Sequence, residues 1–234
     1  MFNLIKFIGW KFYDLYKAFY NVIMKVETPL NLYGIIGYFG LPGKGKSVAM
    51  TYELDMLRKK YGDKIYIATN YGYKDQDFHM DNWEHLLKEY DKPLVVGYDE
   101  IQNEFSSRDY KNFPSELIYL LTQQRKGNGV RIYYTAQRYG RVDKIWRELT
   151  SYAFECNTIM GRWTRARGYH WEDYEMLQKE VDVGRKMKVR PLKRVSFIQT
   201  NRLRDLYNSY DIIESSKSKE YITLEEQHKR LDNN

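Results

Sequence analysis

The stretch GLPGKGKS, residues 40–47, decides the fold of this chain. It follows an apolar run, YGIIGY at 33–38, and it leads into a stretch of helical character from Val48 to Tyr61, which Gly62 closes. The eight residues match the pattern GxxxxGK[ST] in full. A strand before this pattern and a helix after it are the context in which it binds phosphate groups. The sequence therefore predicts a phosphate-binding loop between a buried strand and a helix.

The residue types in this loop suit a nucleoside polyphosphate and a divalent cation. Glycines let the backbone turn tightly and direct its N–H groups inward, and the start of the following helix adds partial positive charge. Lys46 can reach the β- and γ-phosphates, and the Ser47 hydroxyl can ligate Mg²⁺. Lys44 is an extra cation that either touches phosphate or faces solvent. The predicted nucleotide-binding residues are Gly40, Gly43, Lys44, Gly45, Lys46, Ser47 and Val48.

Two adjacent carboxylates end the next apolar strand of interest, LVVGYDE at 94–100. Asp99 would hold the Mg²⁺ shell together with Ser47, and Glu100 would polarise an attacking water as a positioned carboxylate base. Such pairs also occur by chance on surfaces. Because an intact phosphate loop lies upstream, with room for one strand between, we interpret the pair as metal ligand and catalytic base.

The stretch TQQRKGNGVRIYYTAQRYG, 122–140, places amide and guanidinium groups at both ends of an apolar strand. Val130–Ala136 is expected beside the Asp99 strand, with Gln137 at its carboxyl end, where active groups collect in such sheets. We predict that Gln137 senses the γ-phosphate or the lytic water. Arg125 precedes the strand and therefore lies on the opposite side of the sheet from Gln137, where the strands begin. It is either an arginine finger for a neighbouring subunit's nucleotide or a solvated arginine near a helix C-terminus.

Further strands at 64–69 and 153–160 alternate with helical stretches, which predicts an α/β fold with a mostly parallel sheet covered by helices. An extra strand between the two nucleotide motifs, with a glutamate beside the aspartate, resembles the additional-strand (RecA/FtsK-like) P-loop ATPases. The sequence has no NKxD guanine-reading motif and no LSGGQ-type signature. ATP with Mg²⁺ is therefore the favoured nucleotide.

Three segments together, Gly40–Ser47, VVGYDE at 95–100 and QQRKGNGVRIYYTAQR at 123–138, resemble the zonular occludens toxin-like ATPase domain. That group includes filamentous-phage assembly ATPases and belongs to the FtsK–HerA superfamily of DNA pumps. The resemblance covers roughly residues 33–165, and LRDLYNSYD at 203–211 extends it with weaker specificity. It implies an oligomeric, usually hexameric, ATPase that moves or extrudes DNA.

One departure bears on the function. Filamentous-phage members carry a transmembrane helix after the ATPase domain, whereas no run here approaches the roughly 20 apolar residues that a span requires. We therefore expect an ATP-driven DNA translocase of phage morphogenesis, a genome-packaging or genome-export motor docked on a capsid vertex or on a membrane-associated partner. The alternatives are an extrusion ATPase working with a separate membrane subunit and a nucleotide-gated binding module. A small-molecule kinase is disfavoured, because Glu100 supplies a water-activating base.

Composition is compatible with these expectations without proving them. The chain has 234 residues, a net charge of +7 and a single cysteine, so a polyanionic partner such as DNA is plausible and an internal disulfide framework is excluded. Basic residues gather at 184–194 and at Arg162, Arg165 and Arg167, the second group interleaved with aromatics. Each group suits sequence-independent contacts with a nucleic-acid backbone, or else forms a solvated charged face.

The expected organisation is an amphipathic helix at 1–28, an ATPase domain at 29–212 and a polar tail at 213–234. The amphipathic pattern covers residues 1–26. We expect this helix to pack on its own domain or on another subunit, or else to lie on a membrane surface. The expected location is the cytoplasm, that of the host if a phage encodes the chain, with peripheral membrane contact left open.

Overall fold

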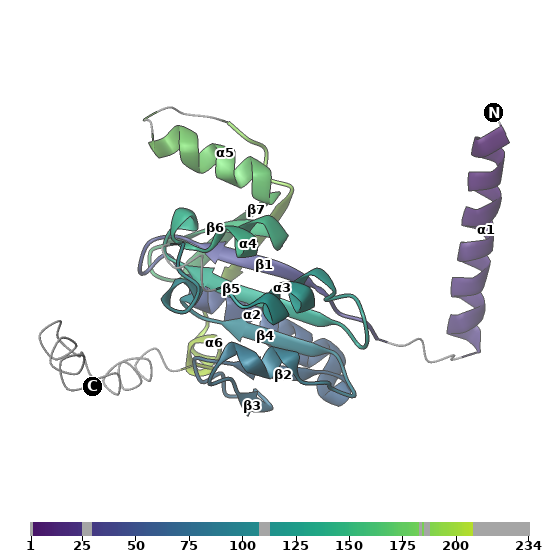
Figure 1. Cartoon of the computed structure of the whole chain (residues 1–234), viewed down its shortest axis with the longest axis horizontal. Coiled ribbons are helices and arrows are strands. Elements are labelled where there is room, and N and C mark those ends of the chain that lie inside the picture. Colours follow the sequence, from purple (N-terminus) through teal and green to yellow (C-terminus); the bar gives the residue numbers. More distant parts are fainter. Residues whose placement is uncertain (1, 25–29, 108–112, 183, 185–187, 208–234) are drawn as a thin grey trace, which may run out of the picture. The chain divides into compact units, whose positions relative to one another are not determined.

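The computed structural model describes residues 2–24, 30–107, 113–182, 184 and 188–207 (Figure 1). These residues belong to two units, 1–31 and 32–234. The predicted polar tail, 213–234, lies outside the described residues. The predicted domain boundaries stay predictions.

The larger unit is built on an eight-stranded sheet with the order β3-β2-β4-β5-β1-β6-β7-β8. The strands from β3 to β6 pair in parallel, and β7 and β8 extend the sheet as antiparallel strands. Their bounds are β1 Gly34–Phe39, β2 Tyr66–Thr69, β3 Phe78–His79, β4 Leu94–Tyr98, β5 Val130–Ala136, β6 Thr150–Ile159, β7 Trp163–Tyr169 and β8 Lys193–Ile198.

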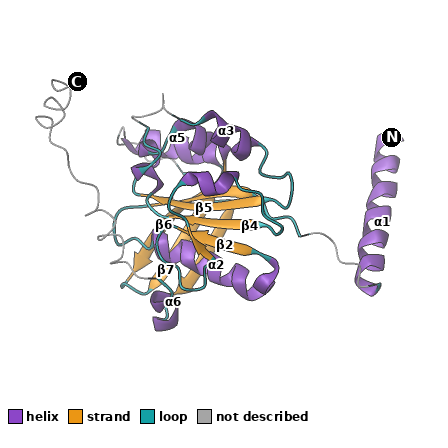
Figure 2. Ribbon diagram, turned by 60° about the horizontal axis from the view of Figure 1, so that its bottom comes forward, coloured by secondary structure: helices purple, strands orange, loops and turns teal. Residues whose placement is uncertain are grey.

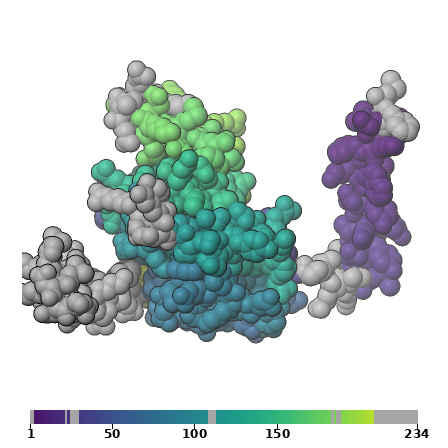
Figure 3. Space-filling model, viewed as in Figure 1, coloured from purple at the N-terminus to yellow at the C-terminus, as the bar shows by residue number. Residues whose placement is uncertain are grey.

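Helices cover both faces of this sheet. Figure 2 shows α3 and α5 on one side and α2 and α6 on the other. The helices are α2 Lys46–Tyr61, α3 Ser115–Thr122, α4 Lys144–Leu149, α5 Trp171–Asp182 and α6 Asn201–Asp205, with single turns of 3₁₀ helix at Gly62–Lys64, Trp83–Leu87, Ile101–Asn103 and Tyr139–Arg141. The surface of the unit, seen from the side of Figure 1, has α5 at its upper end (Figure 3).

The position of β5 confirms the predicted fold class. β5 pairs with β1 on one side, through Tyr38 and Thr135, and with β4 on the other, through Tyr98 and Tyr134. One strand therefore separates the strand that leads into the phosphate loop from the strand that ends in Asp99. The chain has the α/β fold of a P-loop NTPase with a mostly parallel sheet.

Aromatic side chains fill much of the core. Phe39 at the end of β1 stacks on Tyr174 of α5 with ring centroids 5.4 Å apart, and Tyr139 meets both rings edge-on. The buried Tyr134 hydroxyl lies 2.8 Å from the Thr150 hydroxyl, so its polar end is paired. Part of the tyrosine content of the chain thus serves the packing of the core.

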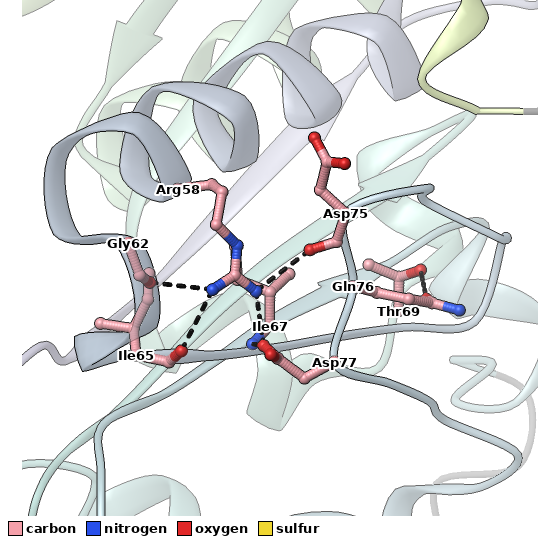
Figure 4. Close-up of polar contacts among 8 residues, drawn as sticks. All are labelled: Arg58, Gly62, Ile65, Ile67, Thr69, Asp75, Gln76 and Asp77. Carbon is pink, nitrogen blue, oxygen red and sulfur yellow. Dashed lines mark hydrogen bonds and ion pairs between the residues drawn. The ribbon is translucent and has the colours of Figure 1, made fainter.

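A polar cluster ties the C-terminal end of α2 to the β2–β3 region (Figure 4). The Arg58 guanidinium donates to the carbonyls of Gly62 (2.8 Å) and Asp75 (3.0 Å) and to the Asp77 carboxylate. Asp77 in turn accepts from the backbone N–H of Ile67 at 2.7 Å. These bonds fix α2, whose other end carries the phosphate loop, against the sheet edge.

The antiparallel extension is the part of the fold that the sequence pattern did not predict. Along β7 the side chains alternate between exposed Trp163, Arg165 and Arg167 and buried Thr164 and Ala166. From Thr164 to Gly168 the buried residues are small, so this part of the strand lacks the apolar signal of an inner strand. The expected strand at 153–160 also begins earlier, at Thr150, where it lines up with Ile35 of β1.

The smaller unit consists of the helix α1, Phe2–Ile23. Large apolar side chains recur along it every three or four residues, which places them on one face, and they are exposed: Leu4, Ile8, Phe12, Leu15, Phe19 and Ile23. Within the described residues, none of the helices combines the length and apolar character that crossing a bilayer requires. Docking of α1 on a protein or on a membrane surface stays a prediction.

Candidate active site

The phosphate loop adopts a tight turn that depends on glycine at its centre. Gly45 has φ 85°, in the left-handed region, and forms the N-cap of α2. A Cβ at this position would lie 2.4 Å from Thr158 Oγ1 and 3.0 Å from Thr164 Oγ1, closer than a side chain tolerates. Thr158 Oγ1 also donates to the Lys44 carbonyl at 3.1 Å. The strands β6 and β7 therefore press on the loop and hold its shape.

Asp99 accepts hydrogen bonds from two hydroxyls that come from different elements. Ser47 Oγ, in the first turn of α2, donates to Asp99 Oδ1 at 2.8 Å, and Thr135 Oγ1, from β5, donates to the same oxygen at 2.5 Å. Asn70 fixes the backbone of Asp99 from the other side, with bonds to its N–H (2.7 Å) and its carbonyl (3.1 Å). The carboxylate is thus held in one orientation against the phosphate loop.

Burial raises the pKa of Asp99, and the hydrogen bonds from Thr135 and Ser47 offset this only in part. A buried carboxylate of this kind gains stability when a cation neutralises it. Its Oδ1 and the Ser47 hydroxyl are oxygen ligands of the type that Mg²⁺ prefers. Mg²⁺ is commonly held by one or two carboxylates together with substrate phosphates and waters. The described residues contain no cluster of three or more His, Cys, Asp or Glu side chains that could hold a metal ion by themselves.

Glu100 is held in an unusual backbone conformation. Its φ and ψ are both 51°, a left-handed conformation that costs a non-glycine residue about 1–2 kcal/mol. Its N–H donates to Thr135 Oγ1 at 2.9 Å, and Gln102 donates to its carboxylate. The carboxylate lies 3.6 Å from the Lys46 ammonium, which is itself buried. The contacts fix the position of Glu100 beside the phosphate loop.

These residues line a cavity of about 700 Å³. Gln137, at the end of β5, borders it as its position in the sequence led us to expect. The structure thus brings together the phosphate loop, both carboxylates and Gln137. Lys44 is not among the lining residues, and its ammonium donates to Asn157 at 3.3 Å.

Besides Pro42 of the loop itself, the cavity is lined by five residues that sequence reasoning did not assign: Thr158, Gly161, Gln199, Arg204 and Tyr207. They come from the end of β6 and the turn after it, from the residue that follows β8, and from the α6 region. Arg204 donates to Gln199 Oε1 at 3.0 Å and to the Gly161 carbonyl, and Gln199 Nε2 donates to Thr164 at 2.7 Å. The segment 203–211 contains Arg204 and Tyr207, and its weak family resemblance was the only signal for this wall.

α6 is held in place by charge. Arg202 donates to both oxygens of the buried Asp55 carboxylate on α2, at 2.8 and 3.0 Å. Such bidentate pairing restrains both side chains. The wall that carries Arg204 is therefore anchored to the same helix that begins at the phosphate loop.

Arg125 lies in the turn between α3 and the start of β5, at the opposite end of β5 from Gln137. Its guanidinium carbon is 4.9 Å from the centre of the Tyr33 ring. The neighbouring Gln124 accepts from the Gly34 N–H at 2.8 Å and so clamps the turn to β1. Arg125 does not line the cavity, and its role as an arginine finger stays a prediction. Arg131 lies nearby, and its Nε donates to the Tyr33 carbonyl at 3.1 Å.

No model of a known protein family matches the sequence, and no curated protein matches it. Among solved structures, the chain is similar to the N-terminal domain of zonular occludens toxin from Neisseria meningitidis, with a TM-score of 0.48, 18% identity, and 76% of this chain and 100% of that chain covered.

It is also similar to the genome packaging NTPase from Sulfolobus turreted icosahedral virus 2. The structure with ATP-gammaS gives a TM-score of 0.40 and 16% identity over 57% of this chain and 77% of that one. The structure with sulfate gives 0.43 and 15%, over 74% and 98%. Both kinds of protein agree with the resemblance that the motifs indicated. The function proposed for this chain rests on the residues of its site rather than on these distant similarities.

Proposed function

We propose that this chain hydrolyses ATP in the cavity between the phosphate loop and the ends of β4 and β5. The observation that supports this most strongly is the convergence on one carboxylate. Ser47 and Thr135 both donate to Asp99, while Lys46 and Glu100 lie together beside it. A structural ion pair alone does not need a strained glutamate, a glycine-dependent loop and a cavity of this size.

The proposed roles follow from the chemistry of each group. The loop amides and Lys46 bind the phosphates, and Ser47 and Asp99 hold the metal. Mg²⁺, when bound, neutralises charge on the phosphate oxygens. Glu100 orients and activates the attacking water, and Gln137 contacts the γ-phosphate or that water.

The contact between Lys46 and Glu100 suggests how substrate prepares the site. In the structure the ammonium and the carboxylate, 3.6 Å apart, partly neutralise each other. Phosphate oxygens compete for the same ammonium because they carry more charge. When Lys46 turns to the phosphates, Glu100 becomes available to a water molecule.

We further propose that hydrolysis drives the movement of DNA in phage morphogenesis, with the chain acting as a genome-packaging or genome-export motor. If Arg125 acts on a nucleotide, it does so across a subunit interface, because it lies at the amino ends of the strands, away from the cavity of its own chain; the alternative is a solvated arginine. A ring of copies, docked on a capsid vertex or a membrane-associated partner, meets that requirement. An extrusion ATPase with a separate membrane subunit and a nucleotide-gated binding module remain the alternatives.

The test is ATP hydrolysis by purified protein, with and without DNA, alongside Lys46→Ala as the inactive control. We expect ATP turnover in the wild type and none in Lys46→Ala. DNA should increase the turnover of the wild type, and the protein should assemble when ATP and DNA are both present. Turnover in the Lys46→Ala variant would contradict the site. Turnover that ignores DNA, in a protein that stays monomeric, would leave the ATPase standing and contradict the motor.

A further inference from the structure

Two groups of basic residues that are separate in the sequence meet on the antiparallel extension of the sheet. Arg167 of β7 pairs directly with Arg194 of β8. Lys188 and Arg190, in the segment leading to β8, line the same hollow as this pair. Together with Arg165 we call these residues the basic face: Arg165, Arg167, Lys188, Arg190 and Arg194.

Strand alternation places the basic face on the side of the sheet that carries α5. Phe197 of β8 stacks on Tyr52 of α2, with ring centroids 4.2 Å apart, so Arg194, three positions away on the same strand, faces the other way. Arg194 therefore shares a side with Arg167. Its neighbour Lys193 faces the α2 side and lies 3.7 Å over the Tyr152 ring.

The basic face includes a hollow of about 500 Å³. It is lined by Glu155 and Arg167 from the sheet, by Leu177 of α5, and by residues 188–191 together with Arg194. Figure 1 shows α5 beside β7 near the top of the view. The hollow is distinct from the phosphate cavity, with which it shares no lining residue.

The charges of the hollow are poorly balanced. Arg167 forms an ion pair with Glu155 at 2.7 Å. Within the described part of the chain, Lys188, Arg190 and Arg194 have no carboxylate partner, and all three are exposed. Four cations thus face one carboxylate, and a concave surface lined by one sign of charge concentrates counter-ions.

Aromatic and polar groups extend the same surface. The Arg165 guanidinium lies 5.5 Å from the centre of the Trp163 ring, whose Nε1 donates to Ser196 at 2.7 Å. With Arg167, these side chains stand in a row along β7. Fixed arginines beside an exposed ring suit a polyanionic strand, whose phosphates bind the guanidinium groups and whose bases can stack on the ring.

We propose that the basic face is a binding site for the sugar–phosphate backbone of DNA. The choice of DNA as the polyanion rests on the proposed function, whereas the excess of positive charge does not. The site is also close to the nucleotide. Asn157, the cross-strand neighbour of Arg165, accepts the hydrogen bond from Lys44 of the phosphate loop. DNA bound at the basic face would therefore lie next to Asn157, a residue that contacts the phosphate loop directly.

The test compares two double variants of the full chain. Arg190→Ala/Arg194→Ala removes two charges from the basic face, and Lys74→Ala/Lys88→Ala removes two exposed charges outside both basic groups as the matched control. Binding to labelled single-stranded and duplex DNA of equal length is followed by fluorescence anisotropy without nucleotide, over a range of salt concentrations. Melting temperatures and ATP turnover without DNA establish that both variants fold and keep the separate ATP site.

We expect the basic-face variant to bind DNA roughly tenfold or more weakly and to lose about 2 from the slope of log affinity against log salt, as for two phosphate contacts. The control should bind as the wild type does. Equal effects in the two variants, or unchanged binding in both, would overturn the proposal. The same variants are also tested for binding to vesicles of anionic phospholipid. If the basic-face variant loses binding to the vesicles but keeps its binding to DNA, the proposal is likewise overturned. Because binding is measured without nucleotide, an inactive ATP site does not affect this result.

Discussion

The Ser47 hydroxyl donates to Asp99 Oδ1 across 2.8 Å, and this bond joins the start of α2 to the end of β4. The two residues follow strands that are not neighbours, because β5 lies between β1 and β4. Thr135 of β5 fills the gap and donates to the same oxygen. The inserted strand is therefore part of the site, since its hydroxyl sets the position of the carboxylate.

Thr135 should prove essential to the geometry of both acids. Thr135→Val keeps the shape of the side chain but removes the donor to Asp99 and the acceptor for the Glu100 N–H. We expect the free energy of unfolding to fall by about 1–3 kcal/mol, as for an unsatisfied buried polar group, and ATP turnover to fall with it. Chemical denaturation measures the first quantity. Thr135→Ser, which keeps the hydroxyl, is the control and should retain both properties.

Asp99→Asn should stabilise the nucleotide-free protein while abolishing Mg²⁺-dependent hydrolysis. The amide oxygen can still accept from Ser47 and Thr135, and the cost of a buried charge disappears. We expect a rise in melting temperature of about 2–4 °C, as about 1 kcal/mol gives in a domain of this size.

The effect of Asp99 should depend on pH. Because its pKa is raised in the folded protein, the folded state binds the proton more tightly than the unfolded state. The destabilisation is therefore absent below the ordinary pKa of an aspartate and develops as pH rises through the raised value. The difference in melting temperature between the wild type and Asp99→Asn should shrink as the pH falls. A difference that is independent of pH would contradict the assignment.

Arg125 is tested by mixing subunits. Arg125→Ala and Lys46→Ala should each be inactive as pure proteins, because one lacks the finger and the other cannot bind phosphate productively. In a mixture, an intact Arg125 from a Lys46→Ala subunit can serve the intact loop of its neighbour. Turnover should therefore recover partly in mixtures. The absence of recovery at every ratio would count against action across an interface.

Cys156 should be inert in the native protein. Burial raises the pKa of its thiol to about 12, so almost no thiolate is present at pH 8. Its carbonyl lies against Gly40 at the base of the phosphate loop. We expect iodoacetamide to modify it slowly in the native state and rapidly in denaturant, as followed by mass spectrometry. Fast modification of the folded protein would show that the region around the loop is open.

The local motifs were predictable from the sequence because each carries its own chemistry. The run 40–47 specifies a turn that only glycine-rich sequences form, and Asp99 and Glu100 stand at the end of a short apolar strand. The position of β5 beside the Asp99 strand was also predictable, because Val130–Ala136 reads as a buried strand and Gln137 follows it directly. Predicting these features required no knowledge of contacts between distant segments.

The wall formed by Gln199 and Arg204 could not be predicted in this way. It reaches the cavity only because β7 and β8 fold back beside β6, and the exposed positions of β7 include two arginines, Arg165 and Arg167. The basic face is similar. Arg167 and Arg194 are 27 positions apart, and the register of β7 and β8 makes them neighbours. Neither group of cations is distinctive until the strands pair.

The most direct test of the account is ATP turnover by Glu100→Gln, with ATP binding measured in parallel and Glu116→Gln, an exposed carboxyl at the start of α3, as the control. Glu100→Gln keeps the shape of the side chain and leaves the phosphate-binding loop intact. We predict that it binds ATP as tightly as the wild type and hydrolyses it about 10²–10⁴-fold more slowly, the usual contribution of a general base. Turnover near that of the wild type would contradict the assignment of Glu100 and, with it, the proposed mechanism.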